Sequence, residues 1–256
     1  MEKIPDEVNS LLEEIAVGFP VLLGENLTGI YLYGSLTQGA FDPGRSDIDC
    51  IVVTRGELSD GEFTAVGEWL ENSSARNPWT AKLQMSFLLR TQVLVMDSKA
   101  CLYQFGRLVR CGSDGNPIFW INILKSGVTL YGPPAGEFVP EITPAILHEA
   151  LVRETGYLRD ELRNEKSEWR DVPKYRAYAV LTLCRILYSR ATGEIGSKPE
   201  AAEWARAALP LELQEIVDRA LKGDSEEIPL ERISEFVELV SERLDRFGIS
   251  DLGFRI

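Results

Sequence analysis

Apolar residues follow two different periods in the first half of the chain. Ile30–Tyr33 and Cys50–Val53 are short apolar runs, rich in β-branched and aromatic residues and bounded by turn formers, and this pattern predicts strands. Leu83–Leu89 repeats the pattern and predicts a third strand. The other elements expected here are two amphipathic helices, a short helix and a closing strand, over residues 5–19, 58–72, 117–126 and 128–131.

Beyond residue 144 the apolar spacing is helical almost throughout, and helices are predicted over roughly 144–165, 174–192, 198–207, 211–222 and 229–246. The proline-rich segment that ends at Pro144 breaks regular structure and separates two compositions, so it marks a domain boundary. We therefore predict an α+β protein. An N-terminal domain of residues 1–138, with a small mixed sheet and helices, precedes a C-terminal all-α helical bundle of residues 139–256.

The charge of the chain narrows the class of partner. Acidic residues outnumber basic ones by 40 to 27, which gives a formal net charge of −13. Such a field opposes nucleic acid, whose binding depends on phosphate neutralisation by Lys and Arg, and favours a small cationic substrate. Acidity of this degree is also common in proteins that are acidic for solubility alone.

The cysteines and the hydropathy of the chain indicate the cellular compartment. The four cysteines lie far apart without a Cys-x-x-Cys pair, and the single histidine, His148, cannot complete a zinc cluster. The N-terminus has no uninterrupted apolar core, and no run of ~20 apolar residues occurs, so we expect neither a signal peptide nor a membrane span. A reduced, cytoplasmic monomer is the simplest interpretation.

Candidate chemistry lies where the second predicted strand begins. Because successive strand side chains alternate, Asp47 and Asp49 project together, and two adjacent carboxylates repel each other unless a cation lies between them. Hard oxygen ligands of this kind suit Mg²⁺ completed by substrate phosphates. At the end of the first strand, Gly34 allows close backbone approach to a phosphate, and Ser35 offers a hydroxyl and an N–H at a potential helix start. The alternative interpretation is a solvated turn with a helix cap.

Two sets of motifs indicate a family. An apolar strand ending in Gly34-Ser35 and followed by Asp47-Ile48-Asp49 resembles the nucleotidyltransferase superfamily of DNA polymerase β type. The segment Val180–Ala205, VLTLCRILYSRATGEIGSKPEAAEWA, with Gln104-Phe105-Gly106 upstream, resembles streptomycin/spectinomycin adenylyltransferases. The resemblance implies a nucleotidyltransferase domain that binds ATP and Mg²⁺ and a helical domain that closes over it. It implies transfer of AMP to a hydroxyl of an aminoglycoside or aminocyclitol antibiotic, a resistance activity.

The resemblance also implies roles for individual residues. The expected metal ligands are Asp47 and Asp49, and the expected nucleotide contacts are Gly34, Ser35, Ser46, Arg185 and Lys198. Arg185 could instead be an ordinary charged residue of a helix, and Lys198 could be an ordinary surface lysine.

The third strand departs from the family pattern. The family has a glutamate there as general base, and the alignment puts Gln84 at this position, although an amide cannot accept the proton. Three explanations remain open: a glutamate changed deliberately to glutamine, a natural protein that uses another carboxylate, or a slipped alignment. Glu149, Glu154 and Asp171 are the candidate substitutes.

The residues expected in the antibiotic pocket also depart from the family pattern. Leu108 stands where the family has a tryptophan, Asp171 matches a substrate-binding aspartate, and Tyr175 and Tyr178 replace an acid and a histidine or asparagine. The tyrosines serve equally well as helix packing residues. A catalytically silent nucleotide-binding homologue, or transfer to another small molecule or a protein hydroxyl, are therefore the alternative functions.

Overall fold

The chain forms two compact units, Met1–Glu141 and Ile142–Ile256. The computed structural model describes residues 4–96, 98–113, 115–168 and 172–246. A sheet with helices makes up the first unit and helices make up the second, so the predicted α+β class is confirmed. The division after Glu141 falls three residues beyond the boundary predicted after residue 138.

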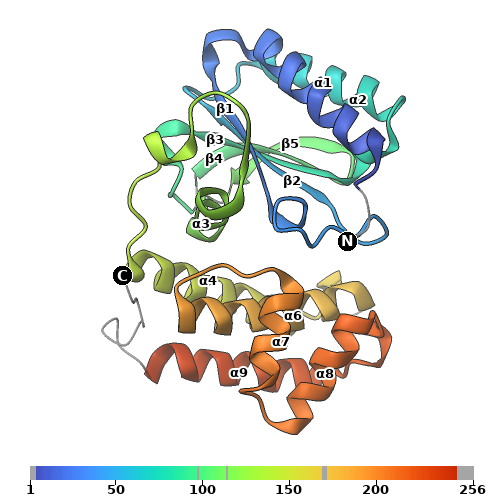
Figure 1. Ribbon diagram of the computed structural model, residues 1–256, viewed down its shortest axis with the longest axis vertical. Helices are drawn as coiled ribbons and strands as arrows, with labels where there is room; N and C mark the ends of the chain where they lie inside the picture. Colours follow the sequence, from blue (N-terminus) through green and yellow to red (C-terminus); the bar gives the residue numbers. More distant parts are fainter. Residues whose placement is uncertain (1–3, 97, 114, 169–171, 247–256) are drawn as a thin grey trace. The chain divides into compact units, whose positions relative to one another are not determined.

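The first unit is built on a mixed six-stranded sheet with the strand order β5-β4-β3-β2-β1-β6 (Figure 1). β2 and β3 run parallel, and every other neighbouring pair is antiparallel. The elements of this unit, in chain order, are α1 (Asp6–Leu23), β1 (Leu27–Tyr33), β2 (Ile48–Thr54), α2 (Asp60–Ser74), β3 (Leu83–Leu89), β4 (Ser98–Gln104), β5 (Arg107–Ser113), α3 (Pro117–Ser126) and β6 (Val128–Tyr131).

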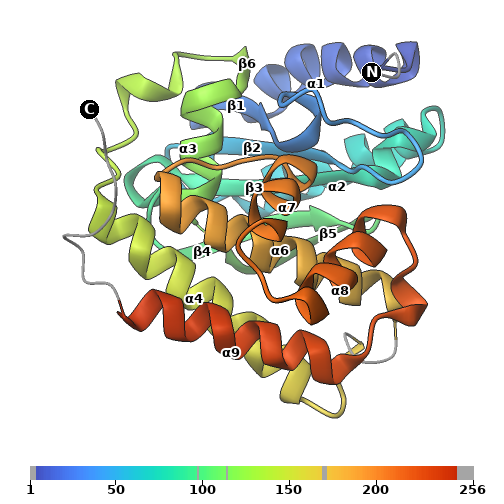
Figure 2. The same cartoon turned by 60° about the horizontal axis from the view of Figure 1, so that its bottom comes forward.

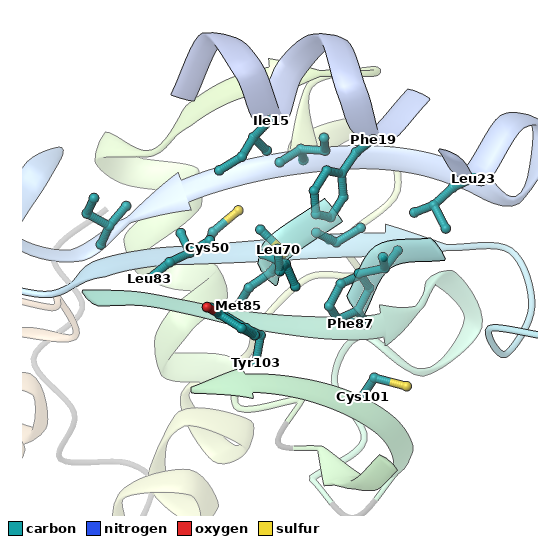
Figure 3. Packing of buried hydrophobic residues seen from close by; sticks show 14 of the residues in the cluster. Ile15, Phe19, Leu23, Cys50, Leu70, Leu83, Met85, Phe87, Cys101 and Tyr103 are labelled. Carbon is teal, nitrogen blue, oxygen red and sulfur yellow. The ribbon is translucent and has the colours of Figure 1, made fainter. Parts of the chain in front are cut away.

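Helices cover both faces of this sheet. α1 and α2 lie on one face, and α3 lies on the other (Figure 1). The main hydrophobic core fills the α1/α2 face, where the Phe19 ring of α1 stacks on Phe87 of β3 with the ring centroids 6.2 Å apart (Figure 3). On the α3 face, Tyr31 packs edge-on against Trp120, with ring centroids 6.0 Å apart. Ile48 and Cys50 of β2 and Leu83 and Met85 of β3 belong to the α1/α2 core, so alternation turns Asp49 of β2 and Gln84 and Ser86 of β3 toward the α3 face.

Two features of this unit differ from the sequence-based expectation. The hairpin of β4 and β5 was not predicted, because its two-residue turn places Phe105 at a φ of 52° and Gly106 at 73°, and a phenylalanine is an unusual residue for a left-handed turn position. α1 continues to Leu23 instead of ending near residue 19, although it contains Pro20. Burial of Phe19 and Leu23 against the core favours the extra turn.

The second unit consists of α4 (Pro144–Arg163), α6 (Pro173–Thr192), α7 (Lys198–Arg206), α8 (Leu211–Lys222) and α9 (Leu230–Arg246). Their ends agree with the predicted helices to within two residues. α4 and α9 lie side by side, and α6 packs against both and against α7 and α8 (Figure 2). Among the helices of the described residues, none has the length and apolar character needed to cross a bilayer.

Candidate active site

The acidic pair lies at the beginning of β2. Ile48 and Cys50 are fully buried in the core, so alternation turns the side chain of Asp49 toward the α3 face, and Asp47 is exposed just before the strand. Burial, with a smaller contribution from the Asp49 charge, raises the pKa of the Cys50 thiol. Cys50 is therefore an inert core residue, and Asp47 and Asp49 are the candidate functional groups at this strand end.

Gln84 adjoins the acidic pair. It lies opposite Asp49 in the parallel register of β2 and β3, so the two side chains share a face. Its Nε2 donates a hydrogen bond of 2.8 Å to Oδ2 of Asp47. Asp47, Asp49 and Gln84 thus form one polar cluster in which an amide stands beside two carboxylates.

Gly34 packs directly on this cluster. It opens a short 3₁₀ turn, Gly34–Leu36, so the helix start expected there is only three residues long. Its φ is 77°, and a Cβ at this position would lie 2.2 Å from Oδ2 of Asp49. Both the left-handed backbone and the close approach require glycine. The Gly34 N–H donates to Oδ1 of Asn122 on α3, at 3.3 Å.

The loop between β1 and β2 is ordered by its own polar groups. The backbone N–H of Asp42 donates to Oγ of Ser46 at 3.0 Å, and the Ser46 N–H donates back to the Asp42 carbonyl at 2.7 Å. Because the Ser46 hydroxyl acts as an acceptor there, its proton can still be donated. Lys82, just before β3, donates to the Pro43 carbonyl at 2.8 Å.

The second unit gathers a cationic cluster around Tyr178 on α6. Nζ of Lys198, the first residue of α7, lies 4.9 Å from the centroid of the Tyr178 ring. Burial and the charge of Glu154 raise the pKa of Tyr178 to about 12, against the opposing effects of the Arg185 charge and a hydrogen bond with Thr182. Tyr178, predicted as a substrate contact, therefore lies beside the two predicted nucleotide cations.

The other residues considered for the antibiotic pocket are Tyr175, Asp171 and Leu108. Tyr175 faces Lys174, whose Nζ lies 5.0 Å from its ring centroid. Asp171 lies outside the described residues. Leu108, on β5, packs against the hydrophobic core of the α1/α2 face, and Asp49 projects from the opposite face of the sheet.

The side chains that could act as metal ligands at this site determine which cation would fit. Among the described residues, no group of three or more His, Cys, Asp or Glu side chains is placed to hold a metal. The pair of carboxylates, exposed at Asp47 and half-buried at Asp49, fits Mg²⁺, which is typically bound by one or two carboxylates and completed by water and substrate phosphates. It does not fit an all-protein metal cage.

Two residues that contact the site were not predicted from the sequence. Asn122 is a polar interruption of an apolar helix, and Lys82 precedes a predicted strand; neither belongs to a motif. Only the contacts of Asn122 with Gly34 and of Lys82 with Pro43 identify them.

Two family models match the chain. A nucleotidyltransferase domain matches residues 21–84, which include the acidic pair and end at Gln84. The C-terminal domain of aminoglycoside adenylyltransferase matches residues 137–243.

A crystal structure of spectinomycin adenyltransferase AAD(9) from Enterococcus faecialis, with ATP and spectinomycin, has the same fold. The TM-score is 0.70 at 18% identity, and the match covers 94% of this chain and 99% of that one.

Relatives of known name span nearly the whole chain. A spectinomycin 9-adenylyltransferase of Campylobacter jejuni is 27% identical over 224 residues, which cover 82% of this chain and 81% of that protein. An aminoglycoside (3'') (9) adenylyltransferase of Rhizobium radiobacter is 36% identical over 255 residues, which cover 91% of each. The family inferred from the strand and helix motifs is thereby confirmed. The chain belongs to the aminoglycoside adenylyltransferase family and is a nucleotidyltransferase.

Proposed function

We propose that this protein transfers AMP from Mg·ATP to a hydroxyl of an aminoglycoside or aminocyclitol antibiotic. The observation that carries the proposal is the polar cluster of Asp47, Asp49 and Gln84 at the adjoining ends of β2 and β3. The relatives from Rhizobium radiobacter and Campylobacter jejuni, named for aminoglycoside and spectinomycin adenylylation, support the substrate class.

The proposed reaction is a substitution at the α-phosphorus of ATP. The acceptor hydroxyl oxygen forms a bond to phosphorus, the bond to pyrophosphate breaks, and the hydroxyl proton is released. Asp47 and Asp49 would hold Mg²⁺, which when bound neutralises charge on the phosphates. Ser35 and Ser46 donate hydrogen bonds to phosphate oxygens. Such a reaction depends mainly on positioning and charge stabilisation, which these residues supply.

Arg185 and Lys198 are the proposed triphosphate contacts of the helical domain. Lys198 is exposed and held over the Tyr178 ring, and Nε of Arg185 is buried without a hydrogen-bond partner among the described side chains. A buried guanidinium nitrogen without an acceptor is costly, and a phosphate oxygen would satisfy it. We assign Tyr178 to the support of these cations and Tyr175 and Asp171 to the acceptor.

The proton acceptor is the open part of the mechanism, since the Gln84 amide cannot take the hydroxyl proton. Glu154 is the substitute that we propose to test first. It is half-buried beside Tyr178, whereas Glu149 is exposed. Glu154→Gln should lower kcat for AMP transfer with little change in the KM for ATP, and an unchanged kcat would remove Glu154 from the mechanism.

A silent nucleotide-binding homologue is the second candidate function, and Gln84 is the feature that favours it. The test is pyrophosphate release from Mg·ATP with a panel that includes spectinomycin and streptomycin, run on the natural sequence and on Gln84→Glu. Release that requires both substrates supports transfer. Mg·ATP binding by calorimetry, with no release from either protein, would instead support the silent binder or a different acceptor, such as a protein hydroxyl.

We further propose that the protein acts as a cytoplasmic monomer on a small cationic substrate and does not bind nucleic acid. The formal charge of −13 supports the cationic substrate and the exclusion of nucleic acid, because it attracts cations and repels phosphate backbones. Light scattering coupled to size exclusion tests the oligomeric state, and a mass twice that of the chain would contradict it.

A further inference from the structure

Asn122 connects α3 to the turn that carries Ser35. The residue is 2% exposed, and its Oδ1 accepts the Gly34 N–H at 3.3 Å. On the same helix, Oγ of Ser126 lies 3.4 Å from this oxygen. The Gly34 N–H is therefore engaged inside the protein, which leaves the phosphate contacts of this turn to Ser35.

The helix that carries Asn122 is fixed to the rest of its unit. Trp120 is fully buried, and its Nε1 donates to the Val93 carbonyl at 2.7 Å. Asn116 caps the helix by accepting the Ile118 N–H at 2.9 Å. α3 is thus a rigid support from which the Asn122 side chain reaches the end of β1.

Gly34 in turn lies close to Asp49, one residue of the acidic pair. Gly34 approaches Asp49 so closely that an added Cβ would lie 2.2 Å from the carboxylate oxygen. A shift of Gly34 toward β2 would displace the Asp49 side chain, and a shift away would leave it unsupported. Asn122 therefore fixes the position of Gly34 relative to a proposed metal ligand.

Burial of the Asn122 amide costs free energy, and packing alone gives no reason for this cost. Its Nδ2 is buried and has no hydrogen-bond partner among the described residues. An apolar side chain of the same size would avoid this penalty. The oxygen that holds Gly34 gives a reason for an asparagine at this position.

We propose that Asn122 is a positioning residue of the nucleotide site, which holds Gly34 so that Ser35 and Asp49 are correctly placed for Mg·ATP. The inference rests on the proposed function of this site as an ATP site. Asn122 acts through the Gly34 backbone, whose N–H its Oδ1 accepts.

Calorimetric titration with Mg·ATP tests the inference. Asn122→Leu keeps the branched shape and the number of side-chain heavy atoms and removes the acceptor. We expect it to raise the Kd about tenfold, the loss expected for one positioned hydrogen bond, and to raise the Mg²⁺ concentration needed for half-maximal binding. Removal of the unpaired Nδ2 offsets the loss of the Gly34 hydrogen bond, so its melting temperature should stay near that of the natural protein.

Ile123→Ala is the matched control. Ile123 neighbours Asn122 on α3 and is 5% exposed, so truncation destabilises the same helix without removing the acceptor for Gly34. This variant should melt earlier and keep the Kd for Mg·ATP. An unchanged Kd in Asn122→Leu would overturn the role of Asn122, whereas failure of the natural protein to bind Mg·ATP would overturn the proposed function itself.

Discussion

Gln84 donates a hydrogen bond of 2.8 Å through Nε2 to Oδ2 of Asp47, while its backbone pairs with Asp49 across β2 and β3. The amide gives one carboxylate of the acidic pair a donor. A glutamate at this position would instead place a third negative charge on the same face. We therefore expect the identity of residue 84 to affect stability, metal affinity and catalysis together.

Gln84→Glu should destabilise the metal-free protein and strengthen its response to Mg²⁺. Like charges on neighbouring strand positions cost up to about 1 kcal/mol, and loss of the amide donor adds to this. Urea unfolding in EDTA and in Mg²⁺ measures both effects.

Gln92→Glu is the matched control for that experiment, because it makes the same chemical change in a separate 3₁₀ turn after β3. It should respond little to Mg²⁺. Equal Mg²⁺ responses of the two variants would show that the effect reflects net charge alone and not the cluster at Asp47 and Asp49.

The sequence predicts the placement of the acidic pair better than the residues that contact it. Alternation along β2 suffices to place Asp47 and Asp49 on one face, and the prediction needs no tertiary information. The contact with Gln84 depends on the register of β3, and the contact of Asn122 with Gly34 depends on how α3 packs against the sheet. Neither register nor packing has a local signal in the chain, which is also why the hairpin turn at Phe105 escaped prediction.

Gly34→Ala should impair both folding and nucleotide binding. A left-handed φ of 77° costs a non-glycine residue about 1–2 kcal/mol, and the new Cβ would also meet the Asp49 carboxylate. We expect loss of stability of about 2 kcal/mol or more and loss of measurable Mg·ATP binding.

Gly106→Ala separates the effect of the left-handed backbone from the effect of a close approach to Asp49. Gly106 has a similar φ of 73°, but nothing lies within 4 Å of an added Cβ. This variant should lose about 1 kcal/mol of stability and keep Mg·ATP binding. If calorimetry gives both variants the same Kd, the close approach of Gly34 to Asp49 has no functional importance.

Lys198→Ala should raise the KM for ATP about tenfold, because we propose that this cation neutralises charge on the triphosphate. Steady-state kinetics with saturating acceptor measures this. Lys174→Ala is the control, since Lys174 makes the same kind of contact with Tyr175, at 5.0 Å, as Lys198 makes with Tyr178, at 4.9 Å. If the two variants raise the KM equally, Lys198 has no specific role at the nucleotide.

Glu62 should make the stability of the first unit depend on pH. It completes the capping box of α2, where its carboxylate accepts hydrogen bonds from Ser59 N at 2.8 Å and Ser59 Oγ at 2.7 Å, and from Asn26 Nδ2 at 3.0 Å. Burial acts to raise the pKa of Glu62, but these hydrogen bonds outweigh it and hold the pKa below its ordinary value.

A carboxyl whose pKa is lowered by folding stabilises the protein above its unfolded pKa, and this contribution is lost as the pH falls through the folded pKa. Glu62→Gln should therefore cost about 1 kcal/mol in urea unfolding at pH 7, and the difference should shrink steadily below about pH 4. Glu71→Gln, at an exposed position on the same helix, should leave the pH profile unchanged. A cost for Glu62→Gln that is the same at pH 7 and pH 3.5 would mean that the carboxylate stabilises α2 by packing alone, without the charge-assisted hydrogen bonds.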